Sequence, residues 1–200
     1  TEGGEERTPA DVLRQALRYR PYWKERGGIT VSGGEPLLQL PFVTELFRLA
    51  KEQQVSTVID TAGGPFTEDE PFFSAFRALL PLTDLFLLDI KHIDSARHLA
   101  LTGTSNAPVL ALARYLSEQG KSMWIRHVLV PGWTTAADDL HRLADFIGTL
   151  RTVERVEVLP YHAMARHNYE ALHLPYPLGD TPVPTAEEIE RAEAILCGGN

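Results

Sequence analysis

Hydrophobic residues along the chain form two patterns: short β-branched or leucine-rich runs, and longer segments with apolar positions three and four residues apart. The first pattern is typical of strands and the second of amphipathic helices. Strands are predicted over residues 29–32, 57–60, 85–90, 123–130 and 153–159. Helices are predicted from Thr8, where a hydroxyl precedes Pro9 and Asp11 as in a helix cap, and over residues 42–53, 71–80, 107–119, 137–150 and 185–196.

This order of elements predicts a parallel α/β fold. Strands and helices alternate regularly, at about the thirty-residue spacing of βαβ units. The run "LFLL" is continuously apolar, which suits a strand buried on both faces. The late segment "LPYPLGDTPVP" is rich in proline, and we expect it to be extended before the last helix.

Composition narrows the class of protein and its partners. With 200 residues, 44% of them hydrophobic and 23% charged, the chain can bury one core, so we expect a single domain over residues 1–200. A net charge of -8 argues against nucleic acid or an anionic membrane as the main partner. No apolar run approaches the ~20 residues of a membrane span, and the first residues do not resemble a signal peptide, so we expect a cytoplasmic protein.

Polar residues gather where the predicted strands end. In parallel barrels and open α/β sheets, ligands bind at the carboxyl edge of the strands because the following loops converge there. The residues at or just past these ends are Ser32, Gly33, Gly34, Glu35, Asp60, Thr61, Asp89, Lys91, Arg126, Tyr161 and His162.

Two interpretations of the acidic residues in this set stay open. Strand alternation places Asp89 and Lys91 on one face, where they can share a ligand or pair with each other. Asp60, Thr61 and Asp89 offer the oxygen ligands that a hard cation prefers, although Asp60 can equally cap amides of the turn that follows it.

The segment "ITVSGGEPLLQ" indicates the kind of ligand. Two glycines at a strand end leave backbone carbonyls open to an ammonium group, and Lys91 or Arg126 can take a carboxylate. An amino-acid-like zwitterion suits this edge better than a phosphate, because Glu35 stands where a phosphate loop carries lysine. His162 can contact a planar ring, although a lone histidine is more often structural.

Taken in order, "ITVSGGEPLLQ", "VIDTAG", "LLDIKH", "MWIRHVLVPGW" and "VLPYH" resemble one family. They are similar to the radical S-adenosylmethionine enzymes that activate glycyl radical enzymes, most closely the pyruvate formate-lyase activating enzymes. The resemblance runs from about Thr8 to the final helix. It implies a partial (β/α)6 barrel of parallel strands, TIM-like and open on one side, with S-adenosylmethionine across its mouth.

The resemblance also implies roles for individual residues. Gly33, Gly34 and Glu35 match the motif that binds the methionyl ammonium. Asp60, Thr61 and Asp89, with the carbonyl of Leu87, match positions that hold a monovalent cation. The positions that match cofactor contacts are Asp60, Asp89, Lys91, Arg126 and His162.

In this family, a reduced 4Fe-4S cluster cleaves S-adenosylmethionine to a 5′-deoxyadenosyl radical. That radical takes a hydrogen atom from a glycine of the partner, here expected to be pyruvate formate-lyase, and a flavodoxin-type protein donates the electron. Orientation and exclusion of water are the work of the protein.

Cysteine content departs from the family pattern. The cluster needs three thiolates from a C-x-x-x-C-x-x-C loop, and the only cysteine is Cys197. We therefore expect the first barrel strand and the cluster loop upstream of Thr1, and this chain alone to be inactive. Two alternatives stay open: a cluster-free module that binds S-adenosylmethionine or a partner, and an α/β-barrel enzyme in which Lys91 forms a Schiff base.

Overall fold

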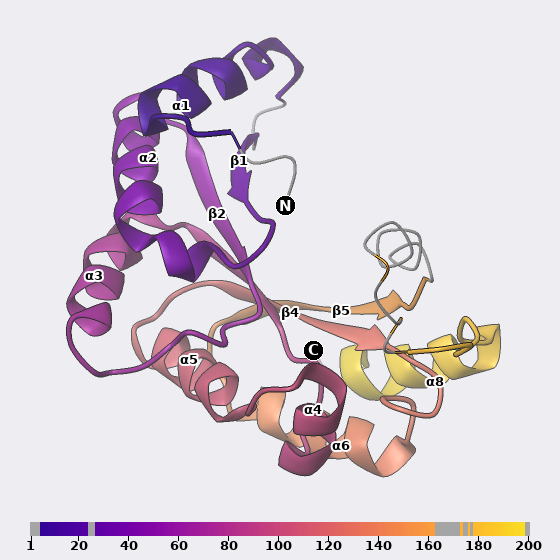
Figure 1. The fold of residues 1–200 in the computed structure, drawn as a ribbon. Coiled ribbons are helices and arrows are strands. Elements are labelled where there is room, and N and C mark those ends of the chain that lie inside the picture. The colour runs from indigo at the N-terminus through magenta and orange to yellow at the C-terminus, as the bar shows by residue number, and fades with distance from the viewer. Residues whose placement is uncertain (1–4, 24–26, 163–172, 174–175, 177, 199–200) are drawn as a thin grey trace.

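A computed structural model describes residues 5–23, 27–162, 173, 176 and 178–198. In this part of the chain, five parallel strands form one sheet in the order of the sequence (Figure 1). The strands are β1 (Gly28–Val31), β2 (Ser56–Thr61), β3 (Leu85–Asp89), β4 (Met123–Leu129) and β5 (Val153–Pro160). This is the α/β sheet of a partial TIM-like barrel, as predicted.

Helix α1 precedes the first strand, the other helices follow strands, and the helices lie along the outside of the curved sheet (Figure 1). They are α1 (Pro9–Leu17), α2 (Leu40–Glu52), α3 (Phe72–Leu79), α4 (Ser95–Thr102), α5 (Ala107–Glu118), α6 (Ala137–Gly148) and α8 (Ala186–Cys197). Thr8 caps α1 as predicted, accepting a hydrogen bond from the Asp11 amide at 3.2 Å.

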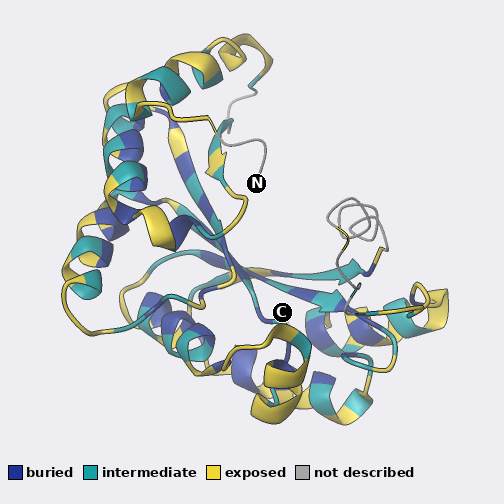
Figure 2. Ribbon diagram, in the orientation of Figure 1, coloured by how far each residue is buried: buried dark blue, intermediate teal, exposed yellow. Residues whose placement is uncertain are grey.

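The core lies between the helices and the outer face of the sheet. Side chains alternate along each strand, so that every second residue points outward to the helices. In β3, Phe86 and Leu88 are fully buried, whereas Leu85 and Leu87 on the inner face are only half-buried (Figure 2). The prediction that "LFLL" is buried on both faces is therefore wrong, because the helices cover one face alone.

Helix α4 is absent from the prediction. Asp94 caps it by accepting hydrogen bonds from the amides of Ala96 and Arg97, both at 3.0 Å, and Gly103 ends it in the left-handed conformation with φ of 76°. An acid before Ser95 and a glycine nine residues after that acid are ordinary cap signals. They delimit a helix of only 8 residues, which is too short to show a clear apolar period.

The segment "LPYPLGDTPVP" lies partly outside the described residues. Its described part turns at Leu178–Asp180, where the Thr181 amide bonds the Leu178 carbonyl at 3.0 Å, so an extended conformation is wrong there. Among the helices of the described chain, none is long and apolar enough to cross a membrane.

Replacing Phe86 with alanine should lower the free energy of unfolding by about 3–5 kcal/mol, because the ring is 0% exposed and its loss leaves a cavity under the helices. Urea titration followed by circular dichroism measures this. Leu38→Ala, at a side chain that is 72% exposed, should change the same quantity by less than about 0.5 kcal/mol. Equal losses in the two variants would show that the core is misplaced.

Candidate functional site at the carboxyl edge of the sheet

The loop after β1 presents bare backbone at the edge of the sheet. Gly33 and Gly34 have φ of 87° and 53°, in the left-handed region that favours glycine. A Cβ added to either residue would have no atom within 4 Å. These glycines are therefore required by the path of the backbone and not by close packing, and the loop stays open on the side where side chains would stand.

Glu35 holds this loop to the loop after β2. Its carboxylate accepts hydrogen bonds from the Leu37 amide at 3.0 Å, from the Thr61 hydroxyl at 2.6 Å and from the Ala62 amide at 3.0 Å. The Thr61 hydroxyl in turn accepts from the Gly63 amide at 2.8 Å. The Glu35 carboxylate thus already has three donors, and it is the backbone of the glycine loop that remains free to meet a ligand.

Arg126 joins two acidic residues across three strands. From β4, its Nε donates to Asp89 Oδ1 on β3 at 2.8 Å, and its Nη2 forms an ion pair with Asp60 on β2. Lys91 Nζ donates to the other oxygen of Asp89 at 2.6 Å. The side chains of Arg126 and Asp89 are 17% and 15% exposed, so this network is half-buried yet open to solvent.

The charges in this network reinforce one another. Burial opposes the charged form of Arg126, but the neighbouring Asp89 and the bond to Asp60 outweigh it, so the pKa of Arg126 is raised. Asp60, Asp89, Lys91 and Arg126 therefore lie together, as predicted. The Asp89–Lys91 pair that the sequence left open does form.

Three other predicted positions are not part of this network. The Thr61 side chain is 2% exposed and bonds Glu35, so its hydroxyl does not lie with the Asp60 carboxylate. Leu87 is a half-buried neighbour of Asp60 in the sheet, as its Cα partner on β3. His162 is exposed just past β5. One open interpretation was that Asp60 caps amides of the following turn; the Ala62 and Gly63 amides donate to Glu35 and Thr61 instead.

A further group of functional-site residues, which was not predicted from the sequence, lies on the inner face of β4 and β5. Trp124 and Arg155 are Cα partners, and the Arg155 guanidinium lies 5.0 Å from the centre of the Trp124 indole. Glu157, the Cα partner of Arg126, bonds Arg155 Nε at 3.1 Å. Their alternation with the buried Ile125 and Val156 was the signal that could have placed them on this face.

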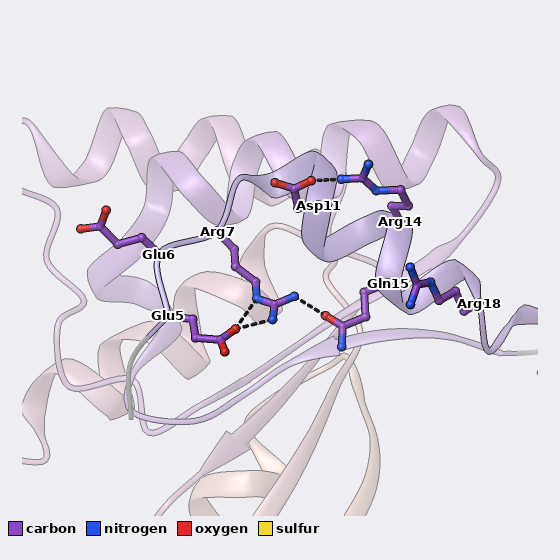
Figure 3. A pocket seen from close by; sticks show the side chains of 7 residues that line it. All are labelled: Glu5, Glu6, Arg7, Asp11, Arg14, Gln15 and Arg18. Atoms are coloured by element: carbon purple, nitrogen blue, oxygen red, sulfur yellow. Dashed lines mark hydrogen bonds and ion pairs between the residues drawn. The ribbon is translucent and has the colours of Figure 1, made fainter. Parts of the chain in front are cut away.

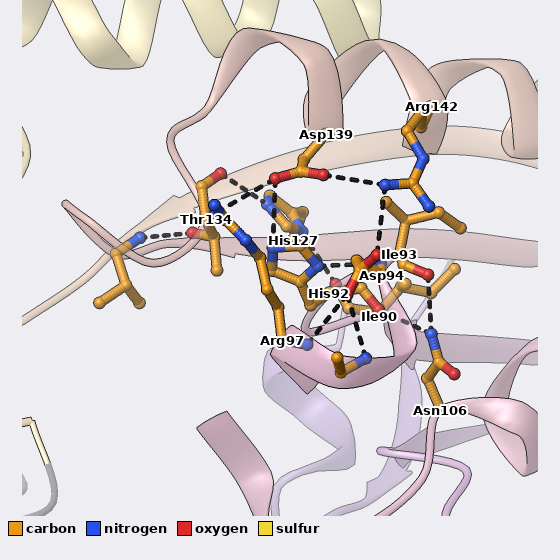
Figure 4. Close-up of polar contacts among 12 residues, drawn as sticks. Ile90, His92, Ile93, Asp94, Arg97, Asn106, His127, Thr134, Asp139 and Arg142 are labelled. Carbon is orange, nitrogen blue, oxygen red and sulfur yellow. Dashed lines mark hydrogen bonds and ion pairs between the residues drawn. The ribbon is translucent and has the colours of Figure 1, made fainter. Parts of the chain in front are cut away.

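Two buried histidines make polar contacts with their neighbours in a separate cluster (Figure 4). His92 and His127 are 1% and 3% exposed. The His92 Nδ1 accepts from the Asp94 amide at 2.9 Å, and its Nε2 faces Asp139 Oδ2 at 3.6 Å. Burial lowers the pKa of both histidines, and for His92 the charge of Asp139 only partly offsets this.

Two of the hollows in the described structure lie beside α1 and beside Lys91. A broad, charged one of about 800 Å³ adjoins α1, where Arg7 bonds Gln15 at 2.7 Å and pairs with Glu5 (Figure 3). Its lining residues are Glu5, Glu6, Arg7, Asp11, Arg14, Gln15 and Arg18. A smaller apolar one of about 220 Å³ adjoins Lys91 at the carboxyl edge of the sheet. Its other walls are Leu101, Thr102, Val128, Val130, Tyr161 and Leu178.

Cys197 does not fit an iron–sulfur site at this edge. Its thiol points to the Val156 carbonyl at 3.4 Å, and Val156 lies on the outer face of β5. Burial raises the pKa of the thiol, which disfavours the thiolate that binds iron. The three thiolates of a 4Fe-4S cluster are not present among these 200 residues.

Comparison with known proteins identifies the class to which this fold and site belong. Residues 1–147 match the Radical SAM superfamily, and the chain belongs to that superfamily. A solved domain of a pyruvate-formate lyase-activating enzyme from Bacteroides vulgatus has the same fold, with a TM-score of 0.69 at 24% identity over 86% of this chain and 94% of that domain.

Sequence relatives identify the group within that superfamily. The chain is 45% identical over 191 residues to the pyruvate formate-lyase-activating enzyme of Streptococcus mutans, covering 96% of this chain and 73% of the relative. It is also 45% identical over 194 residues to the one of Listeria monocytogenes, covering 96% and 78%. The chain belongs to the pyruvate formate-lyase-activating enzymes, which confirms the resemblance. The Schiff-base alternative and the cluster-free module are not favoured.

The two buried histidines should make stability depend on pH. The unfolded chain takes up protons near the ordinary histidine pKa of 6.5, before the folded chain does. The free energy of unfolding should therefore fall as pH drops below 6.5, by up to about 1.4 kcal/mol per pH unit for each histidine. Urea titrations at pH 7.5, 6.5 and 5.5 measure this loss.

The double variant His92→Asn, His127→Asn is the control for this loss. Asparagine offers an acceptor or a donor close to the histidine Nδ1 position but does not titrate. The dependence between pH 6.5 and 5.5 should flatten in the double variant. Equal slopes in the variant and the natural chain would assign the loss to other groups.

Proposed function

We propose that this chain activates pyruvate formate-lyase by generating a glycyl radical through reductive cleavage of S-adenosylmethionine. The observation that carries the proposal is the Asp60–Arg126–Asp89 network beside the bare Gly33–Gly34 loop, on the carboxyl edge of a radical SAM sheet. Acceptors for an ammonium and cations for a carboxylate meet at this edge, as a methionyl group requires.

Each residue has a binding or positioning role in this proposal. The carbonyls of the Gly33–Gly34 loop accept from the methionyl ammonium, and Glu35 keeps that loop in place by tying it to Thr61 and Ala62. Arg126 and Lys91 attract the methionyl carboxylate, while Asp60 and Asp89 hold both cations in position. His162, at the end of β5, contacts the adenosyl part of the ligand.

The chain orients the reaction and leaves the redox chemistry to its cofactors. When bound, the 4Fe-4S cluster and S-adenosylmethionine supply the electron and the 5′-deoxyadenosyl radical that takes a hydrogen atom from a glycine of the partner. The half-buried inner face holds the ligand at the sheet edge, where a protruding loop of a glycyl radical enzyme can reach it. Because the binding groups at this edge are fixed, the bound ligand loses little further entropy in reaching the reactive geometry.

Radical formation tests the function directly. Protein expressed from the gene with all its flanking coding sequence is loaded with iron and sulfide under anaerobic conditions. It is then mixed with pyruvate formate-lyase, S-adenosylmethionine and either dithionite or photoreduced flavodoxin, our proposed donor. A glycyl radical signal in electron paramagnetic resonance should appear with both reductants. A cluster-loaded protein that yields no radical with either reductant would refute the proposal, and a signal with dithionite alone would refute flavodoxin.

The 200-residue chain is the matched control. We propose that the cluster thiolates lie on residues other than these 200, because Cys197 is the only cysteine and faces the outside of β5. The chain alone should therefore show no iron–sulfur absorbance after the same treatment and no radical. Cluster formation on this chain would show that the assignment of the thiolates is wrong.

A monovalent cation is a finer part of the proposal. Asp60, Asp89 and the carbonyls of Thr61 and Leu87 are its candidate ligands. Arg126 occupies both carboxylates in this structure, so cation binding requires the guanidinium to turn toward the carboxylate of the ligand. Among the described residues, no group of three or more His, Cys, Asp and Glu side chains could hold a metal ion, so carbonyl oxygens are essential to this site.

Replacing potassium with tetramethylammonium should weaken binding of S-adenosylmethionine to the cluster-loaded protein about tenfold, because a large cation does not fit between the two carboxylates. Calorimetry measures the dissociation constant. Asp60→Asn should bind the ligand weakly in both salts, since it lacks one of the two charges. An affinity that is the same in both salts for the natural protein would argue that Arg126 takes the place of the cation.

A further inference from the structure

Strand β3 ends at the network of Asp60, Asp89, Lys91 and Arg126. It ends at Asp89, whereas its neighbour β4 continues to Leu129. The last backbone contact between them is the Ile90 amide, which donates to the Arg126 carbonyl at 3.0 Å. Beyond this hydrogen bond, side chains hold the segment that follows β3 in place.

His127 supplies the next contact. Its Nδ1 donates to the Ile90 carbonyl at 2.8 Å, since a carbonyl can only accept. The ring is 3% exposed and lies on the outer face of β4, opposite the Arg126 side chain. Successive residues of β4 thus hold the last residue of β3 and the residue after it from the two faces of the sheet. Arg126 bonds the Asp89 side chain, and His127 bonds the Ile90 carbonyl.

A second buried anchor follows Lys91. His92 accepts from the Asp94 amide, which leaves its proton on Nε2, facing Asp139 of α6. Asn106 holds the His92 carbonyl at 3.2 Å (Figure 4). Lys91 therefore lies between two residues whose backbones are fixed from behind the sheet, while its own amine reaches Asp89 on the inner face.

We propose that His127 is a positioning residue for S-adenosylmethionine binding: its bond to the Ile90 carbonyl fixes the point where β3 leaves the sheet, and with it Asp89 and Lys91 relative to Arg126. The ligand-binding part of this inference rests on the proposed function. Its structural part, that His127 fixes residues 89–93, does not.

Two substitutions of His127 separate the hydrogen bond from the volume of the ring. His127→Asn keeps an N–H donor the same number of bonds from the backbone as Nδ1 but removes the ring. His127→Phe keeps a ring of similar size but has no donor. If the bond positions the site, asparagine should preserve ligand affinity and phenylalanine should not.

Asp84→Ala is the matched control at the other end of the same strand. The Asp84 carboxylate accepts from the Thr57 amide at 2.8 Å, so it anchors the start of β3 as His127 anchors its end. This variant weakens the hold on β3 without touching the carboxyl edge. A loss of affinity in Asp84→Ala equal to that in His127→Phe would show that only general stability matters.

The first readout needs no ligand. Hydrogen exchange of the backbone amides in residues 89–93, measured by mass spectrometry, should be at least about tenfold faster in His127→Phe than in the natural chain, because these amides open when β3 loses its anchor. It should be unchanged in His127→Asn and Asp84→Ala. Unchanged exchange in His127→Phe would overturn the proposal, and this holds even if the protein does not bind S-adenosylmethionine.

The second readout is the dissociation constant of S-adenosylmethionine with the cluster-loaded protein. It should rise about tenfold in His127→Phe and less than twofold in His127→Asn and Asp84→Ala, since small displacements of binding groups cost this much. If His127→Phe does not fold, His127→Asn decides alone: natural affinity supports the donor role, and a tenfold loss refutes it. Absence of binding in the natural protein would instead refute the proposed function.

Discussion

The guanidinium of Arg126 between Asp60 and Asp89 is the interaction on which the rest of the site depends. Three neighbouring strands each contribute one charge to it, and their Cα register decides that these charges meet. Without this guanidinium, the half-buried Asp60 carboxylate would lose its ion pair and Asp89 would keep only Lys91, which is costly in a partly dehydrated place. Lys91 extends the network through its own ion pair with Asp89, so two carboxylates meet two cations at this edge.

Much of this arrangement could be predicted from the sequence because it follows from strand alternation. Once Asp60, Asp89 and Arg126 are assigned to parallel strand ends, the sheet must bring them to one edge, and the structure shows that it does. Strand and helix positions were equally accessible apart from α4, with predicted ends that differ from the observed ones by at most two residues. The bare conformation of Gly33 and Gly34 also follows from their residue type.

The rest depends on contacts between residues far apart in the chain, which no local pattern reveals. Glu35 was assigned to a ligand, yet its carboxylate binds Thr61 and Ala62, 26 and 27 residues away. In the sequence, His127 is one more residue of a predicted apolar strand. Its ring has the Ile90 carbonyl to bind only because β3 ends at Asp89, before β4 does. A histidine in such a run carries no signal of its partner, because burial and hydrogen bonding are decided by the neighbouring strand.

The position of Cys197 makes its thiol a poor ligand for iron. Its thiol lies at the outer face of β5, with a raised pKa, and is separated from the carboxyl edge by the sheet itself. Burial disfavours its thiolate, so the thiol is a poor ligand for ferrous iron and a poor nucleophile toward disulfides. Cys197 is therefore a weak competitor for iron on the outer face of β5 when a cluster is assembled.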